Sequence, residues 1–136
     1  MKILTLIITA LLLAHASAFA INPAEVDIMV TVNKKPVVGP ITLNGGPGIN
    51  QGVTLEVTAS ATDGNSGDIL NYRFKLEGAG QRGWNTWSTV TFISYELEER
   101  DIGLNVVKVE VRDSLETVQA APAEIYVFRT TVEVPQ

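Results

Sequence analysis

The chain has 136 residues, of which 46% are hydrophobic, and a formal net charge of −5 at neutral pH. This length suits one domain. It contains no cysteine and one histidine, His15, which excludes thiol nucleophiles and cysteine-ligated zinc. An acidic chain without a basic cluster is also a poor binder of nucleic acid or of an anionic membrane.

The first twenty residues predict a signal peptide. Lys2 supplies the positive start, residues 3–14 are apolar, and small residues lead to a cleavage site that we place after Ala20. The apolar run, about a dozen residues long, is too short to cross a bilayer. The alternative is an uncleaved N-terminal anchor.

Removal of residues 1–20 would leave nine of the ten basic residues against fifteen acidic ones, a net charge of −6, and no histidine. A histidine-dependent triad is then excluded from the mature chain. We expect a secreted or periplasmic protein with no stable membrane insertion after cleavage, held together by its core alone because it has no disulfides.

Residues 21–40 are expected to form an N-terminal arm or a first strand, with apolar residues alternating at Ile28, Val30 and Val32. Residues 37–43 are apolar but contain Gly39-Pro40, which is typical of an edge strand or of a strand that switches sheets. Residues 44–48 (Asn-Gly-Gly-Pro-Gly) have the composition of a loop.

The segments that follow alternate apolar and polar residues, which predicts half-buried strands. We expect strands at 53–61, 70–77, 92–97, 104–113 and 124–128, with an edge passage at 118–122. The side chains expected to face the core are Val53, Leu55, Val57, Ala59, Ala61, Leu70, Tyr72, Phe74, Leu76, Tyr95, Leu97, Val107, Val109, Val111, Ile125 and Val127.

Short strands at intervals of roughly eight to twelve residues, with no helical period after the first twenty residues, predict an all-β fold. We expect residues 41–136 to form an immunoglobulin-like antiparallel β-sandwich of about seven strands, in which two sheets bury their alternating faces against each other.

Several motifs occur together in this domain. They are Thr58-Ala59-Ser60-Ala61-Thr62, Tyr72-Arg73-Phe74-Lys75, Gly83-Trp84, Asp101-x-Gly103 and Val107-x-Val109-x-Val111-x-Asp113-Ser114. Over residues 41–128 the chain resembles the bacterial extracellular Ig-like modules grouped with the three-tyrosine (Y_Y_Y) domains and, more loosely, PKD repeats. It departs from them in lacking the PKD Trp-Asp-Phe-Gly-Asp-Gly motif and in having Asn105 where a tyrosine is usual. The resemblance implies a spacer, adhesion or sensor-attached module without catalytic residues.

Both tryptophans, Trp84 and Trp87, fall in one loop after the central strand. Exposed aromatic residues on a loop suit a binding surface that stacks on a sugar ring or packs into a partner. The alternative is that at least one of them caps the core. We therefore name Trp84 and Trp87 as candidate ligand-binding residues.

Oxygen-bearing side chains occur in the turn at 62–68 and after the strand that ends near residue 113. Asp63, Asn65, Asp68 and Asp113 would form a calcium site if these two segments lie at the same pole of the sandwich. The alternative is ordinary turn chemistry, because Asp and Asn are common turn residues. No other cofactor is expected.

Carboxylates also cluster at Glu96, Glu98, Glu99 and Asp101, and a glycoside hydrolase would need two such groups facing each other across a cleft. A solvated charged turn is the simpler interpretation. We therefore predict a non-catalytic interaction or structural module that binds a protein partner at the cell envelope or exterior. The alternative is a carbohydrate-binding module that uses the loop tryptophans on a polysaccharide.

Overall fold

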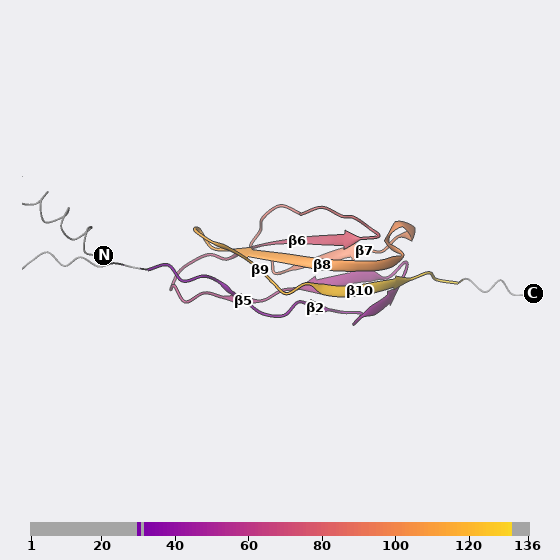
Figure 1. The fold of residues 1–136 in the computed structure, drawn as a ribbon, viewed down its shortest axis with the longest axis horizontal. Coiled ribbons are helices and arrows are strands. Elements are labelled where there is room, and N and C mark those ends of the chain that lie inside the picture. Colours follow the sequence, from indigo (N-terminus) through magenta and orange to yellow (C-terminus); the bar gives the residue numbers. More distant parts are fainter. Residues whose placement is uncertain (1–29, 31, 132–136) are drawn as a thin grey trace, which may run out of the picture. The chain divides into compact units, whose positions relative to one another are not determined.

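The structure, a computed structural model, describes residue 30 and residues 32–131 (Figure 1). The chain divides into two units, Met1–Val32 and Asn33–Gln136. The predicted signal peptide lies outside the described residues. Of the strand predicted around Ile28, only Val30 and Val32 are described, and neither belongs to a strand.

The described part of the second unit, residues 33–131, is built from strands and one short 3-10 helix, η2 (Figure 1). Within the described part of the chain, no helix is long and apolar enough to cross a membrane. The elements, in order, are β1 (Val37–Val38), β2 (Thr42–Leu43), β3 (Gly48–Asn50), β4 (Thr54–Thr58), β5 (Ala61–Thr62), β6 (Asn71–Gly78), β7 (Phe92–Glu96), η2 (Glu99–Asp101), β8 (Gly103–Arg112), β9 (Thr117–Gln119) and β10 (Ala123–Phe128).

The larger sheet has the strand order β3-β10-β8-β6. Strand β8 is antiparallel to β6 along one edge, from the pair Asn71 and Arg112 to the pair Gly78 and Asn105. Its other edge is shared by β10 and then β9. Strand β3 runs parallel to β10, and it is the one parallel pairing among the described strands.

A second sheet has the order β2-β4-β7, and β1 pairs with β5. The prediction for residues 37–43 is confirmed, because the segment breaks at Gly39-Pro40 into β1 and β2, which pair with different strands. The prediction of a loop through Gly48 is wrong at its end. Gly48 begins β3, and an added Cβ there would lie 2.8 Å from the Phe128 ring, so a glycine permits this close approach.

One core cluster contains buried residues of both larger sheets, as in a β-sandwich. The predicted inward faces of β4, β6, β8 and β10 are confirmed by the burial of their alternate residues. Val53 is the exception, since 46% of it is exposed. It lies in the bend before β4, where the strand alternation does not yet apply. The buried apolar residues are Ile49, Leu55, Val57, Ala59, Tyr72, Phe74, Leu76, Tyr95, Leu97, Val107, Val109, Val111, Ala120, Ile125 and Val127.

Candidate functional site

The loop with both tryptophans runs along the free edge of β6. Its backbone bonds to β6 at two isolated bridges, Leu76 with Arg82 and Tyr72 with Ser88. Between these bridges β6 advances four residues and the loop six. The loop therefore bulges by two residues relative to a regular strand.

Asn85 closes the gap that the bulge would otherwise leave. The backbone N–H of Phe74 donates to Asn85 Oδ1 at 2.6 Å, and the backbone N–H of Asn85 donates to the Phe74 carbonyl at 3.1 Å. The edge of β6 is thus covered, and the two tryptophans on either side of Asn85 are anchored through the backbone.

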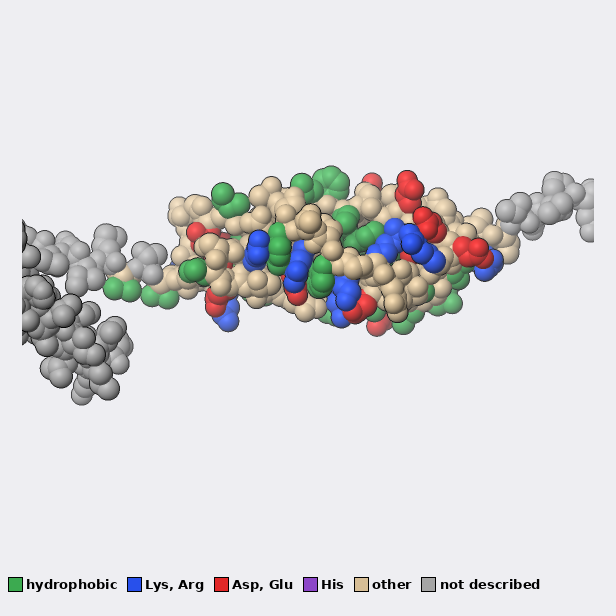
Figure 2. All heavy atoms as spheres, turned by 90° about the horizontal axis from the view of Figure 1, so that it is seen from above, with side chains coloured by type: hydrophobic (Ala, Val, Ile, Leu, Met, Phe, Trp, Pro, Cys, Tyr) green, Lys and Arg blue, Asp and Glu red, His purple; other side chains and the backbone are tan. Residues whose placement is uncertain are grey.

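Both indoles stack with basic side chains. The guanidinium carbon of Arg73 lies 4.7 Å from the ring centre of Trp84 and 4.6 Å from that of Trp87. Lys75 Nζ lies 5.9 Å from Trp84, and the Arg112 guanidinium lies 4.3 Å from Trp87. These five residues form a row that we call the cation–tryptophan ladder, and Figure 2 shows a row in which basic and apolar side chains alternate on one face.

Neither tryptophan belongs to the buried core cluster, and each is half-buried. Two guanidinium groups, those of Arg73 and Arg112, lie close to Trp87. A sugar ring stacking on Trp87 would have to compete with these cations for the ring. Ligand binding by Trp84 and Trp87 stays a prediction. A ligand that approaches these indoles would meet the basic side chains that lie over both rings.

Ion pairs flank the ladder. Arg73 Nη2 lies 2.5 Å from Glu110 across the β6–β8 pair. Glu77 binds Lys108 on β8 and, at 2.6 Å, Lys75 on its own strand. The hydrogen bond from Lys108, followed by that from Lys75, lowers the pKa of Glu77 to about 2.

Arg112 differs from the other cations of the ladder. It is exposed, and it makes no ion pair or side-chain hydrogen bond with any residue from 32 to 131. It also lines an open depression of about 650 Å³, together with Asp68, Asp113 and Leu115. Its guanidinium donors therefore face solvent beside a hollow.

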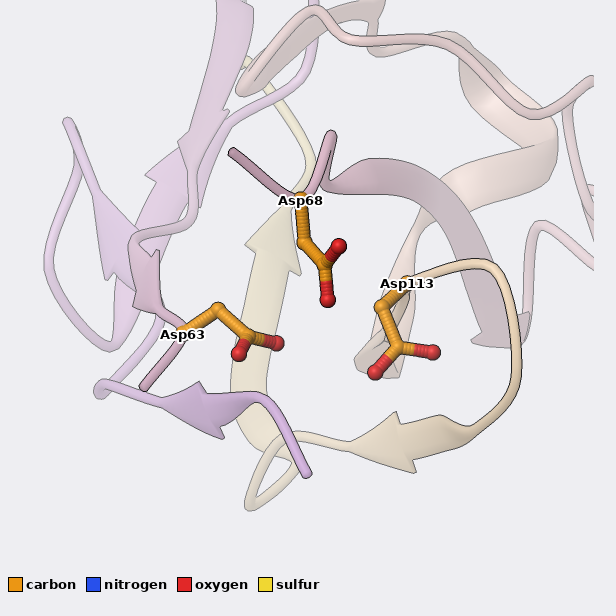
Figure 3. Close-up of side chains that lie close together, drawn as sticks. All are labelled: Asp63, Asp68 and Asp113. Atoms are coloured by element: carbon orange, nitrogen blue, oxygen red, sulfur yellow. The ribbon is translucent and has the colours of Figure 1, made fainter. Parts of the chain in front are cut away.

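The carboxylates predicted to bind calcium lie together. Asp63, Asp68 and Asp113 each offer an oxygen, and these oxygens lie within 4.8 Å of one another; Figure 3 shows the three side chains converging from separate segments. The turn at 62–68 and the end of β8 thus meet at one pole, which is the condition that the sequence analysis set for a calcium site. Calcium binding itself stays a prediction.

Hydrogen bonds occupy part of this cluster. Asp113 accepts from Asn33 Nδ2 at 3.0 Å and from the backbone N–H groups of Leu115 and Glu116, each at 2.6 Å. These bonds, with that from Asn33 the largest contribution, lower the pKa of Asp113. In contrast, Asp63 Oδ2 is shielded from solvent and has no hydrogen-bond partner within the described part of the chain.

Asn65 shapes the turn next to this cluster. Its backbone N–H donates to Asp63 Oδ1 at 2.8 Å, which is an Asx-type turn contact. Its side-chain Oδ1 accepts from the backbone N–H of Lys34, also at 2.8 Å. Asn65 thereby connects the segment around Lys34 to the turn. A role of Asn65 as a calcium ligand stays a prediction.

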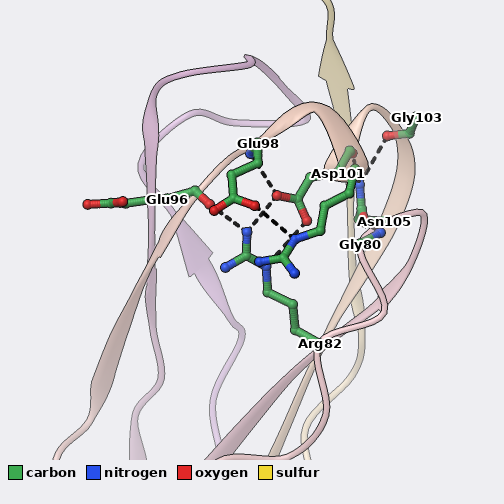
Figure 4. A network of polar contacts seen from close by, with 8 residues as sticks. Gly80, Arg82, Glu96, Glu98, Asp101, Gly103 and Asn105 are labelled. Carbon is green, nitrogen blue, oxygen red and sulfur yellow. Dashed lines mark hydrogen bonds and ion pairs between the residues drawn. The ribbon is translucent and has the colours of Figure 1, made fainter.

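The other carboxylate cluster is held by ion pairs (Figure 4). Asp101 is fully buried and accepts from Arg82 Nη2 at 2.6 Å and from the backbone N–H of Glu98 at 2.8 Å. Burial raises its pKa, but these bonds together with the charge of Arg82 outweigh that effect and lower the pKa. A carboxylate paired in this way serves structure and is no free acid or base.

The remaining carboxylates of this cluster are exposed. Glu98 pairs with Arg100 at 3.0 Å, and Glu99 pairs with Arg129 at 3.1 Å. Neither they nor Glu96 line the depression beside Arg112. Their arrangement fits the solvated charged turn that the sequence predicted. For Asp101 that prediction is wrong, because its carboxylate is buried against Arg82.

Asn105 closes the corner at the start of β8 with three hydrogen bonds. It is fully buried, and its Nδ2 donates to the carbonyls of Asp101 at 2.7 Å and Gly103 at 3.2 Å. Its Oδ1 accepts from the backbone N–H of Gly80 at 2.9 Å. The corner before β8 is therefore closed by an amide (Figure 4).

An apolar patch, not predicted from the sequence, lies at the start of β8 and along β10. Leu104, Tyr126 and Phe128 are 53%, 45% and 50% exposed. Leu104 pairs with Tyr126 across the two strands, and the rings of Tyr126 and Phe128 are 4.9 Å apart. The available signal was the run of aromatic residues at outward positions of β10, where polar residues are usual.

No family model and no curated protein matches this chain. Among solved structures, it is similar to the PKD domain of an M14-like peptidase from Thermoplasmatales archaeon SCGC AB-540-F20, with a TM-score of 0.52 and 21% identity. The match covers 71% of this chain and 98% of that one. This likeness supports the Ig-like, PKD-type fold that the motifs suggested.

Proposed function

We propose that this chain is a secreted, non-catalytic Ig-like module that binds a protein partner at the cell envelope or exterior. The observation that carries the proposal is the outer face of the larger sheet. There the exposed apolar patch (Leu104, Tyr126 and Phe128) lies on β8 and β10, and the cation–tryptophan ladder lies on β6, β8 and the loop after β6, so that β8 carries residues of both.

The composition of this face supports a protein partner. Tyrosine, tryptophan, phenylalanine and arginine are the residues enriched at the centres of protein interfaces. Because Tyr126 and Phe128 are half exposed, they forgo about half of the roughly 1.5–3 kcal/mol that complete burial of a large apolar side chain contributes. A partner that covers the patch would recover that free energy on binding.

The predicted signal peptide at residues 1–20 supports export to the periplasm or exterior. The PKD-type fold adds a second argument, because an isolated β-sandwich presents sheet faces and loops to neighbours without needing an active-site cleft. The proposal assigns no catalytic residue.

A carbohydrate-binding module is the second candidate, favoured by the position of Trp84 and Trp87 on the surface. For it to hold, a sugar would have to bind an indole face in competition with the guanidinium groups of Arg73 and Arg112. Trp84→Ala that abolishes retention on an insoluble polysaccharide would favour this candidate over the first.

The protein-binding proposal is tested by crosslinking in intact cells that export the chain. The double variant Tyr126→Ser, Phe128→Ser should lose a crosslinked partner that the wild type retains. Phe92→Ser is the matched control, because Phe92 is 58% exposed but lies on β7 in the other sheet. Equal capture by all three proteins, or no specific crosslinked partner, would contradict the proposal.

A further inference from the structure

We infer that the cation–tryptophan ladder is the recognition surface for an acidic, extended segment of the partner protein. The inference rests on the proposed function and deepens it by naming the chemistry of the partner. It concerns Arg112, Arg73 and Lys75 as the contacting cations, with Trp84 and Trp87 holding them in place.

The local charge has the opposite sign to that of the chain. The outward positions of β6 and β8 carry four basic side chains against two acidic ones, whereas the whole chain has a net charge of −5. At 0.1 M salt the screening length is about 10 Å, so a ligand over β6 and β8 meets this local positive balance. At the Arg112 end it also meets the carboxylates of Asp68, Asp113 and Glu116, which line the depression. The basic residues are Arg73, Lys75, Lys108 and Arg112, and the acidic ones are Glu77 and Glu110.

Stacking prepares the guanidinium groups for binding. A guanidinium that lies against an indole uses its flat face, which leaves its N–H donors available around its edge. Arg73 spends part of its donors on Glu110. Arg112 spends none on a carboxylate among residues 32–131, so a carboxylate that binds it displaces no internal ion pair. Because stacking already restricts the side chain, less entropy is lost on binding.

The spacing of the cations favours an extended peptide. Arg73 and Lys75 are two residues apart on β6, which places their Cα atoms roughly 6.8 Å apart in a strand. Alternate carboxylates of an extended acidic segment repeat at the same distance. A polysaccharide gains most from a free aromatic face, and here cations already stack on both indoles.

A purely structural role for the ladder makes a different prediction. Trp84 and Arg73 lie where the loop covers the edge of β6, so their removal would disturb the fold. Arg112 contributes no hydrogen bond to that edge. Arg112→Gln therefore separates recognition from packing, because it should leave the thermal midpoint of unfolding unchanged while weakening binding.

Fluorescence offers a direct readout, since both tryptophans of the chain are in the ladder. The full chain is titrated with poly-L-glutamate at 0.1 M salt, and a saturable change in tryptophan emission is expected. Arg112→Gln should weaken the apparent affinity about tenfold, the loss of one charge-assisted hydrogen bond. Arg100→Gln, which removes another exposed charge, in η2, should leave the affinity unchanged.

Three outcomes would overturn the inference. The first is no emission change with poly-L-glutamate, and the second is equal weakening by Arg112→Gln and Arg100→Gln, which would indicate unspecific charge. The third is a change in emission with polygalacturonate but not with poly-L-glutamate, which would indicate that the ladder binds carbohydrate. Failure here is distinct from failure of the proposed function. A cellular crosslink that the double variant Tyr126→Ser, Phe128→Ser abolishes but Arg112→Gln leaves intact would support the protein-binding proposal. It would reject the ladder as the recognition surface.

Discussion

The two ends of β8 hold acidic side chains in opposite circumstances. Before the strand, Asp101 is fully buried and paired with Arg82 (Figure 4). After it, Asp113 lies with two further carboxylates, Asp63 and Asp68, and none of the three forms an ion pair with another described residue (Figure 3).

Each end also leaves one buried oxygen without a partner among the described residues, the Tyr95 hydroxyl near Arg82 and Asp63 Oδ2 in the carboxylate cluster. A neutral hydroxyl is cheaper to bury unpaired than a carboxylate oxygen. The comparison teaches that the buried carboxylate at the first end is paired with a cation, whereas the three neighbouring carboxylates at the second end have no ion pair among the described residues.

The largest expected effect is at the Asp101 end. Arg82→Met should lower the free energy of unfolding by about 3 kcal/mol, because it leaves the buried Asp101 carboxylate without its charged partner. Urea denaturation monitored by circular dichroism measures the loss. Arg129→Met is the matched control, since its pair with Glu99 is exposed on both sides and should cost less than about 0.5 kcal/mol. Equal losses for the two variants would erase the contrast between the ends.

The proximity of the two candidate calcium-binding segments could be considered from the sequence for a clear reason. Asp113 directly follows a strand with a strict alternation, and residues 62–68 form a polar turn, so strand directions alone bring them to one pole. At the other end, the pairing of Arg82 with Asp101 depends on a loop that follows β6 with an irregular register. That register is set by tertiary contacts and leaves no periodic signal.

The cation–tryptophan ladder, too, could be predicted from the sequence only in part. The sequence placed Arg73 and Arg112 on outward faces and both tryptophans in one loop. Their stacking follows from the two-residue bulge at Asn85, which aims the indoles over the sheet. Residues 48–50 were missed as a strand because they directly continue the glycine- and proline-rich stretch at 44–48, although their backbone pairs with β10.

A smaller effect is expected from cation binding at the carboxylate end. If calcium binds Asp63, Asp68 and Asp113, it should raise the free energy of unfolding by about 2.7 kcal/mol at a hundredfold excess over its Kd. Thermal unfolding with calcium or with a chelator measures this. Asp68→Asn should abolish the calcium effect and, by relieving repulsion, raise the stability of the calcium-free protein. Glu124→Gln, an exposed charge on β10, is the control; a calcium shift that persists in Asp68→Asn would contradict the assignment.

The smallest effect concerns Tyr95, the one unpartnered buried oxygen described near Arg82. Burial raises the pKa of Tyr95 from 10.0 to about 12. The unfolded chain therefore ionises first, and stability that is intact below pH 10 falls as the pH rises toward 12. Tyr95→Phe removes this alkaline loss and also an unsatisfied hydroxyl, so it should stabilise the protein at neutral pH by up to about 1 kcal/mol. Denaturation at neutral pH and across the alkaline range measures both effects. A loss of stability in Tyr95→Phe would reveal a hydrogen bond to this hydroxyl, and the network around Arg82 and Asp101 would then extend to Tyr95.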